Sequence, residues 1–370
     1  MVSAMPTARA IGESGTSGRN DYLFIDNARF VSMIAIVMRH CELSLFRDYH
    51  VSTLESAVTQ IRSFGVLLFF VNSAFLMAAW LARPNSSVRA YWQGRLNRVG
   101  KPWLVWASAF QVIGLVKFFS LEGENARELP HQILKGLFLD NYWFVPILFF
   151  SLAIMLPLRR YWRSWSLGLA LLLLSWFYGV NQYTQWIPPS HTTALFGYLF
   201  YLWLGVQLFQ KFRTVREYIK RIPWWFILMI LCLAISLMVV EDEISISVGF
   251  PNYYNALQNS NQIYTLVVLA VLLKIPVRLT PSFIDVRKDS YGIYLTHQIV
   301  GSVGRATIDF AAVVLSTSGK SFFTRLPEMV ENPFARIAIW VLWFGFVYTT
   351  SLVMTKWLRR TTWAWTVGEK

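Results

Sequence analysis

Long runs of apolar residues dominate the chain, and most charged residues lie in the short segments between them. A bilayer core of about 30 Å requires roughly 20 mostly apolar residues in a helix. Windows of this kind occur at residues 24–45, 63–82, 102–120, 142–158, 165–180, 194–210, 223–240, 262–278, 289–315 and 335–357. The pattern predicts an all-α, polytopic membrane protein with about ten transmembrane helices.

The distribution of Lys and Arg predicts the orientation of these helices. With a cytoplasmic N-terminus, 23 of the 34 Lys and Arg residues lie in inside segments, seven lie in outside segments and four lie within spans. Cytoplasmic loops of membrane proteins carry such an excess of basic residues. We therefore expect both termini in the cytoplasm and a multi-pass location in the inner (cytoplasmic) membrane.

Three regions follow from this pattern. Residues 1–20 are small, polar and rich in Gly and Ser, and they lack the apolar core of a signal peptide, so a disordered cytoplasmic tail is expected. Residues 21–357 form the membrane domain, and residues 358–370 form a cytoplasmic C-terminal tail. The segment Leu129–Leu139 has apolar residues at helical spacing, which predicts an amphipathic helix on the outer surface.

Composition narrows the classes of partner. The net charge of +14 would suggest nucleic acid in a water-soluble protein, but 55% of the residues are hydrophobic and the mean hydropathy is +0.43. The lipid bilayer, with its anionic headgroups, is therefore the expected partner, and no nucleic acid is expected. Cys41 and Cys232 both lie in apolar segments, which predicts no disulfide framework, and no Cys/His cluster has the spacing of a metal site.

The first predicted span carries the densest set of ionisable residues. Arg29 and His40 are eleven residues apart, which is about three helical turns, so both lie on one face with a separation of roughly 16.5 Å. Ionisable groups within hydrocarbon are costly and usually functional. Arginine suits phosphate and histidine suits proton transfer, so this face is able to bind a coenzyme A phosphate at one end and meet its thioester at the other. The structural alternative is that Arg29 reaches the headgroups and His40 packs in the bundle.

Further polar residues recur near the predicted spans. Asn72 and Ser73 lie within the second span, where the alternative role is helix packing. Arg95, Arg98 and Lys101 follow at three-residue spacing on the cytoplasmic side. This stripe either presses on anionic lipid or binds the phosphates of a cytosolic nucleotide-bearing donor.

The ninth predicted span opens with a second polar group. Ser290, Tyr294 and His297 lie within two turns, and Tyr294 and His297 share one helix face. His297 is expected near the middle of the membrane. A buried histidine in such a position favours a functional role.

Five segments in order resemble the acyltransferase 3 family of integral membrane O-acyltransferases. They are Arg29 to His40, which resembles an Arg-x10-His motif; the stretch FGVLLFFVNSAF at 64–75; Arg95 to Arg98; Trp143 to Pro146; and SYGIYLTH at 290–297. In the second of these, Leu67 stands where the family usually has Asp, and Ala74 where it usually has Gly. The resemblance covers about residues 21–357.

The resemblance implies transfer of an acyl group, acetyl or sometimes succinyl, from cytosolic acyl-CoA to a hydroxyl of a periplasmic or cell-surface glycan or another acceptor. Acyl-CoA is then a donor substrate, and no cofactor is bound permanently. His40 is expected to act as general base or as transient acyl acceptor. The expected donor-binding residues are Arg29, Arg95, Arg98 and Lys101, and those expected to position substrate or stabilise the oxyanion are Asn72, Ser73, Trp143, Ser290, Tyr294 and His297.

A transporter or flippase of a lipid-linked or anionic solute is the alternative, with the same arginines lining a pathway. Such folds often consist of two related halves with broken helices, and the sequence shows no such symmetry.

The orientation is testable by cysteine accessibility. With Cys41 and Cys232 replaced, Ser86→Cys in the 83–101 segment should react with a membrane-impermeant thiol reagent only from the cytoplasmic side. Glu128→Cys should react only from the outside. Labelling of residue 128 from the cytoplasm alone would contradict the ten-span arrangement.

Overall fold

A computed structural model describes residues 23–41, 57–58, 60–117, 129–138, 142–190, 193–247, 255–315, 329–330 and 332–369. Within these ranges the ordered elements are all helices. They are α3 (Leu23–His40), α5 (Gly65–Leu81), α6 (Val88–Arg95), the π-helix η2 (Leu96–Gly100), α7 (Lys101–Lys117), α8 (Leu129–Phe138), α9 (Phe144–Met155), the 3-10 helix η5 (Pro157–Tyr161), α10 (Trp165–Thr184), the 3-10 helix η6 (Leu195–Tyr198), α11 (Leu199–Gln210), α12 (Phe212–Arg221), α13 (Trp224–Ser247), α14 (Asn259–Lys274), α15 (Val286–Leu315), α17 (Pro333–Leu358) and the 3-10 helix η7 (Ala364–Val367).

Each of the ten apolar windows falls on one of these helices, so the all-α fold class is confirmed for the described residues. The segment predicted to be amphipathic forms helix α8. The number of helices that cross the bilayer stays a prediction. The predicted N-terminal tail at 1–20 lies outside the described residues.

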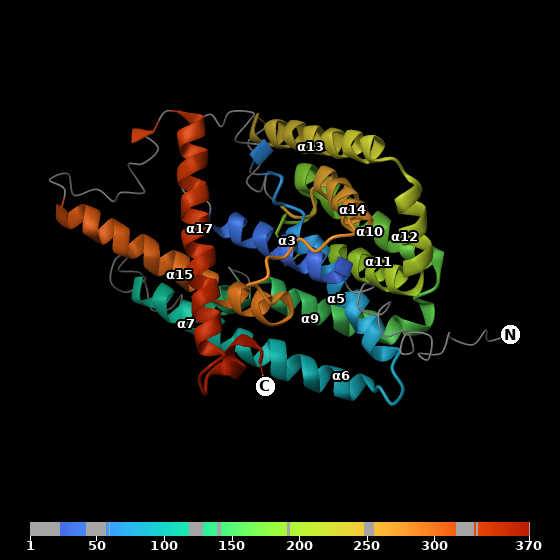
Figure 1. Cartoon of the computed structure of the whole chain (residues 1–370), viewed down its shortest axis with the longest axis horizontal. Coiled ribbons are helices and arrows are strands. Elements are labelled where there is room, and N and C mark those ends of the chain that lie inside the picture. The colour runs from blue at the N-terminus through green and yellow to red at the C-terminus, as the bar shows by residue number, and fades with distance from the viewer. Residues whose placement is uncertain are drawn as a thin grey trace.

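Helix α3 occupies the centre of the molecule (Figure 1). It packs against α5, α14, α15 and α17, so residues from both ends of the sequence surround it. Helices α15 and α17 pack together on one side, and α13 packs on α14 on the other (Figure 1). The first predicted span is therefore the core element that the later helices enclose.

Small residues set the close approach of α5 to its neighbours. A Cβ added to Gly65 would lie 3.0 Å from the Cβ of Ala35 in α3. A Cβ added to Gly205 in α11 would meet the carbonyl oxygen of Val71 and lie 2.9 Å from the Cβ of Ala74. Helix association within membranes depends on such close van der Waals packing, since lipid tails are as apolar as the helices themselves.

Large apolar side chains cover much of the outer surface. Leu233 on α13 is 58% exposed and Leu342 on α17 is 73% exposed. Both helices contain an apolar stretch long enough to cross a bilayer, at Trp224–Ser245 and Pro333–Leu358. Together with the all-helical architecture, this surface fits a membrane protein, in which lipid takes the place of water around the bundle.

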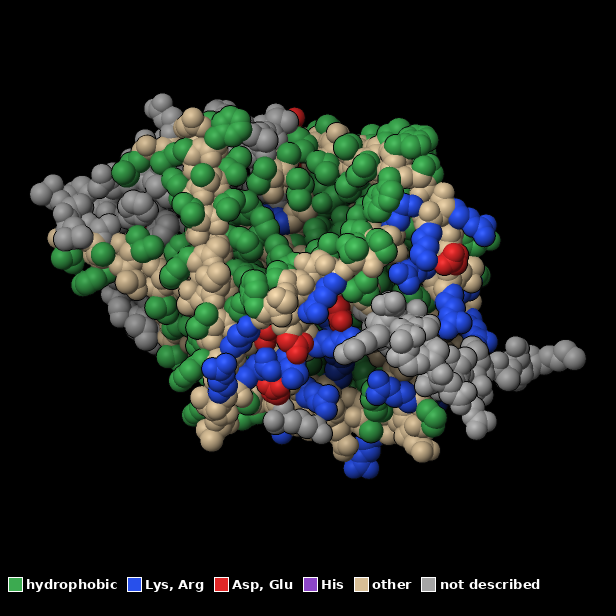
Figure 2. Space-filling model, in the orientation of Figure 1, with side chains coloured by type: hydrophobic (Ala, Val, Ile, Leu, Met, Phe, Trp, Pro, Cys, Tyr) green, Lys and Arg blue, Asp and Glu red, His purple; other side chains and the backbone are tan. Residues whose placement is uncertain are grey.

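The basic side chains are segregated from this apolar surface. In the face shown in Figure 2 they gather along the lower and right edges, whereas the upper part is mainly hydrophobic. Helices α6 and α12, which carry many of them, lie along those edges in Figure 1. Both helices come from segments that the charge pattern assigns to the cytoplasm.

Residues 358–369 of the segment expected as a C-terminal tail pack against the bundle. Its helix η7 contacts α7, α15 and α17. Nε1 of Trp106 donates a hydrogen bond to the carbonyl oxygen of Thr366 at 2.8 Å, and Val367 is fully buried. The C-terminal residues are therefore part of the folded core.

The packing of α5 on α11 makes a prediction for stability. Gly205→Ala should lower the free energy of unfolding by about 1–3 kcal/mol, because the new methyl group would overlap the Val71 carbonyl. The midpoint of thermal unfolding in detergent, followed by tryptophan fluorescence, should fall. Gly345→Ala in α17 is the matched control, because a Cβ there meets nothing within 4 Å. Its midpoint should stay level or rise, and equal behaviour of the two variants would contradict the close packing.

Candidate functional site

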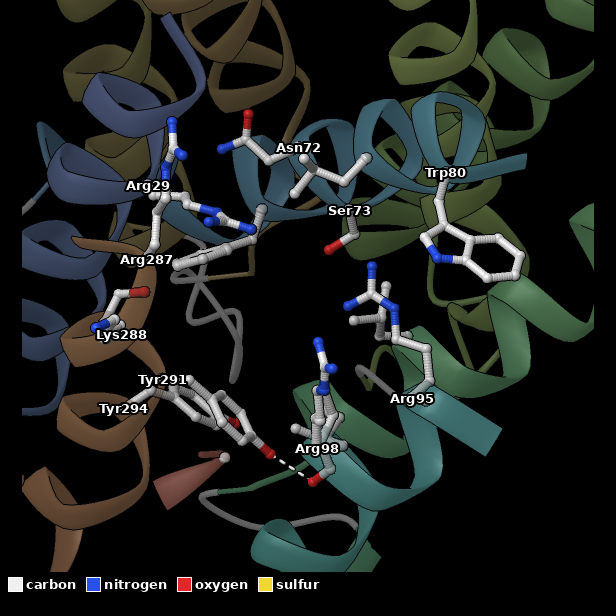
Figure 3. Close-up of a pocket in the computed structure, with 18 of the residues that line it drawn as sticks. Arg29, Asn72, Ser73, Trp80, Arg95, Arg98, Arg287, Lys288, Tyr291 and Tyr294 are labelled. Carbon is white, nitrogen blue, oxygen red and sulfur yellow. Dashed lines mark hydrogen bonds between the residues drawn. The ribbon is translucent and has the colours of Figure 1, made fainter. Parts of the chain in front are cut away.

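A cavity of about 650 Å³ opens between α3, α5, α6, η2, α9 and the start of α15. Its basic lining residues are Arg29, Arg83, Arg95, Arg98, Arg287 and Lys288, and Glu369 is the one acidic residue among the lining residues described. Figure 3 shows that Arg29 and Arg287 extend from one wall, and Arg95 and Arg98 from the opposite wall. A concentration of guanidinium groups around one space suits a phosphate-bearing ligand, because each group offers paired donors to the oxygens.

The α6–η2 segment positions two of these arginines. Helix α6 begins at a Ser87 cap, whose hydroxyl accepts a hydrogen bond from the amide of Ala90 at 3.1 Å. Arg95 ends α6, and its Nε donates to the Tyr91 hydroxyl at 3.1 Å. The π-helix that follows carries Arg98, and π-helical turns occur frequently at functional sites. Lys101, at the start of α7, is exposed and does not line the cavity, so the structure separates it from Arg95 and Arg98.

An ion pair between α3 and α15 fixes the opposite wall. Nε of Arg287 lies 3.0 Å from Oδ1 of Asp26, and its Nη2 lies 3.0 Å from Oδ2. The bidentate geometry holds the guanidinium plane. From the sequence alone, Arg287 is one of the basic residues of a cytoplasmic loop and is not predicted to be a site residue. The signal that identifies it is its position one turn before Ser290 and Tyr291 on α15, since all three line the cavity.

Two further contacts secure the beginning of α15. The Tyr291 hydroxyl donates to the carbonyl oxygen of Val99 in η2 at 2.6 Å (Figure 3). The fully buried Asp289 pairs with Arg359 at 2.6 Å, and Arg359 also pairs with Glu369 at 2.5 Å. Hydrogen bonding to Glu369, reinforced by Asp289, raises the pKa of the Arg359 guanidinium above its ordinary value. The cavity wall is therefore tied to both η2 and the C-terminal segment.

Polar groups without partners face this cavity. Asn72 is 1% exposed, and within the described residues neither its amide nitrogen nor its oxygen has a hydrogen-bond partner. The same holds for the hydroxyl of Tyr294. Buried polar atoms in proteins are nearly always hydrogen-bonded, so these groups are suited to a polar ligand. Ser73 and Ser290 also line the cavity, so the structure brings Asn72, Ser73, Ser290 and Tyr294 together with the arginines.

The two histidines predicted from separate spans lie together. The ring centroids of His40 and His297 are 5.2 Å apart, with an angle of 50° between the ring planes. Nδ1 of His297 lies 2.6 Å from the carbonyl oxygen of Tyr294 and 3.2 Å from that of Ile293. Because a carbonyl oxygen only accepts, Nδ1 carries a proton, and in the neutral ring Nε2 then presents a lone pair. Nε2 has no hydrogen-bond partner within the described residues.

The histidine pair lies just beyond the inner end of the cavity. Arg29, Met33 and Ile36 line the cavity from α3, and His40 is one helical turn beyond Ile36. Tyr294 lines the cavity and its ring lies 5.9 Å from that of His297. The prediction that Arg29 and His40 occupy one face of α3 therefore agrees with the structure, with the arginine in the cavity and the histidine past its end.

Trp143 lies outside the cavity lining. Its ring packs against Tyr198, with centroids 5.8 Å apart, and against Phe144 at 6.4 Å. The structure thus places Trp143 in the aromatic core beside α9. Its neighbour Phe144 does line the cavity.

Family comparison gives the chemical class of the protein. The sequence profile of the acyltransferase 3 family, described as an acyltransferase domain, matches residues 22–358. The chain belongs to the acyltransferase 3 family. This membership confirms the resemblance read from the five segments, and it favours a membrane acyltransferase over a transporter. No curated protein and no solved structure gives a significant match to this acyltransferase.

Proposed function

We propose that this acyltransferase moves an acyl group, acetyl or succinyl, from cytosolic acyl-CoA to a hydroxyl of a periplasmic or cell-surface glycan. The observation that carries the proposal is the arginine-lined cavity that ends one helical turn before the His40–His297 pair. The binding site for a polyanionic donor and a group for proton transfer thus lie along one helix, α3.

The basic side chains of the cavity are complementary in charge to the phosphate groups of acyl-CoA. Arg29, Arg95 and Arg98 project into it from two walls, and the bidentate contact to Asp26 holds Arg287 beside them. Such groups bind phosphate through charge-assisted hydrogen bonds. The donor enters from the cytoplasm, dissociates after transfer and is a substrate rather than a resident cofactor.

The length of α3 matches the length of the donor's arm. Arg29 and His40 are separated by eleven residues, or roughly 16.5 Å along the helix axis. With its phosphates at Arg29, an extended pantetheine arm passes Met33 and Ile36 and brings the thioester to Tyr294 and the histidines. Asn72 and Ser73 then contact the donor within the cavity.

His40 acts as the general base. It accepts the proton of the acceptor hydroxyl while the oxygen attacks the thioester carbonyl carbon. The new C–O bond forms, the C–S bond breaks, and the coenzyme A sulfur takes the proton from His40 as it leaves. The products are the O-acyl ester and free coenzyme A thiol.

His297 and Tyr294 assist this step. With its proton committed to backbone carbonyls, His297 keeps Nε2 as an acceptor for an N–H of the His40 imidazolium that forms. The Tyr294 hydroxyl donates a hydrogen bond to the oxyanion that develops on the thioester carbonyl. Both groups lie on the same face of α15, one turn apart.

We place the site in the inner membrane with ten crossing helices, α3, α5, α7, α9, α10, α11, α13, α14, α15 and α17, and with both termini in the cytoplasm. Helices α6 and α12 then lie at the cytoplasmic surface and α8 at the outer surface. The acceptor approaches His40 from the outside, opposite to the donor.

The donor assignment is tested at α6 and η2. Arg95→Ala/Arg98→Ala should raise the KM for acetyl-CoA at least tenfold, because two charge-assisted phosphate contacts are lost, while the amount of protein in the membrane stays normal. Lys101→Ala is the matched control, since Lys101 lies outside the cavity lining, and its KM should stay unchanged. An unchanged KM in the double variant would remove these arginines from the donor site.

The catalytic role is tested at His40. A general base contributes about 10²–10⁴-fold, so His40→Ala and His40→Gln should retain about 1% or less of the transfer rate. Replacing a polar group within a span does not raise the cost of insertion, so expression and thermal stability should be retained. His297→Gln should lower kcat less than His40→Gln and leave the KM for acetyl-CoA unchanged. If His40→Gln keeps more than about a tenth of the activity, His40 is a packing residue and His297 becomes the candidate base.

A further inference from the structure

A second cavity of about 900 Å³ adjoins the first where α15 begins and α17 ends. Arg287 and Glu369 line both cavities, so the two spaces meet at these side chains. In Figure 2 basic and acidic side chains gather around the lower end of α17, in the same region. The second cavity therefore extends the donor site on the side that carries the basic segments.

The carboxylates lining this cavity already have basic partners. The pairs are Asp26 with Arg287 at 3.0 Å, Asp285 with Lys288 at 3.9 Å, and Asp289 and Glu369 with Arg359 at 2.6 and 2.5 Å. Three basic side chains thus offset three of the four acidic charges, because Asp289 and Glu369 share Arg359.

Three basic residues in the lining of the second cavity are not offset by a carboxylate of the described residues. Among the described residues, no carboxylate pairs with Arg278, Lys356 or Arg360. Nη2 of Arg278 donates to the carbonyl oxygen of Ile284 at 3.3 Å, and Nζ of Lys356 donates to that of Phe283 at 2.5 Å. Backbone carbonyls orient these side chains without cancelling their charge, so the cavity favours an anionic ligand.

An exposed aromatic ring accompanies these cations. Phe283 lines the cavity with 64% of its side chain exposed, and Nζ of Lys356 lies 6.0 Å from its ring centre. Nucleobases stack favourably on such rings. Cations next to an accessible aromatic ring match a ligand that carries both a phosphate and a base.

We propose that the second cavity binds the 3′-phosphoadenosine end of the donor, which rests on the proposed function in that the donor is an acyl-CoA. Arg278, Lys356 and Arg360 surround the 3′-phosphate, and the adenine stacks on Phe283. Arg287, held by Asp26 at the boundary of the two cavities, meets the pyrophosphate. The pantetheine arm continues into the first cavity towards the histidines.

The 3′-phosphate itself supplies the test. We would measure the affinities of coenzyme A and of 3′-dephospho-coenzyme A for the purified full chain by calorimetry in detergent. The variant is Arg278→Ala/Arg360→Ala, which changes two exposed side chains of the second cavity. The matched control is Arg213→Ala/Arg221→Ala, which removes two exposed arginines of α12 that line neither cavity.

The wild-type protein should bind coenzyme A about tenfold more tightly than the dephospho form, as expected for charge-assisted contacts to one phosphate. The Arg278→Ala/Arg360→Ala variant should lose this difference, with weaker binding of coenzyme A and unchanged binding of the dephospho form. Phe283→Leu should weaken both ligands to the same extent, and the α12 control should match the wild type.

Other outcomes would overturn the assignment. If the wild type does not distinguish the two ligands, or if the double variant keeps the difference, the second cavity does not bind the 3′-phosphate. Discrimination without any acyl transfer would instead contradict the proposed function alone, and transfer without discrimination would contradict this inference alone.

Discussion

The cost of placing charge inside an apolar bundle constrains this structure more than any other interaction. Six arginines or lysines line a space whose walls also present Leu, Phe and Val, and each of these charges that is withdrawn from water needs a partner or a ligand. The Asp26–Arg287 pair lies at the edge of this space, with the Arg287 side chain 59% exposed, and joins α3 to the start of α15. Because α15 also carries Tyr294 and His297, this pair sets where those side chains lie relative to α3.

The proposed mechanism depends on the register between α3 and α15. The two helices are far apart in the sequence, yet the His40 and His297 rings lie 5.2 Å apart. Contacts at the beginning of α15, from Tyr291 to η2 and from Asp289 to Arg359, fix the position of this helix relative to η2 and the end of α17. A shift of one helical turn, about 5.4 Å, would separate the histidines and move Tyr294 out of the cavity.

Sequence periodicity predicted the features that depend on one helix, and it missed those that depend on contacts between helices. The common face of Arg29 and His40 follows from helical geometry alone, and so do the apolar windows. The contact of His40 with His297 requires the packing of α15 on α3, which no local pattern encodes. By spacing alone, Lys101 is equivalent to Arg95 and Arg98. However, the π-helix that carries Arg98 ends at Gly100, and Lys101 begins α7 outside the cavity lining.

The C-terminal segment has a practical consequence for anyone who handles this protein. Glu369 lines both cavities and is bound to Arg359, and Gly368 adopts a positive φ of 84° close to the Arg98 carbonyl and the Tyr291 ring. Any polypeptide attached beyond this point emerges at the junction of the two cavities. An affinity tag or reporter fused there would compete for the space of the proposed nucleotide, and a chain that enters at Leu23 would also begin beside the second cavity, which Leu23 lines.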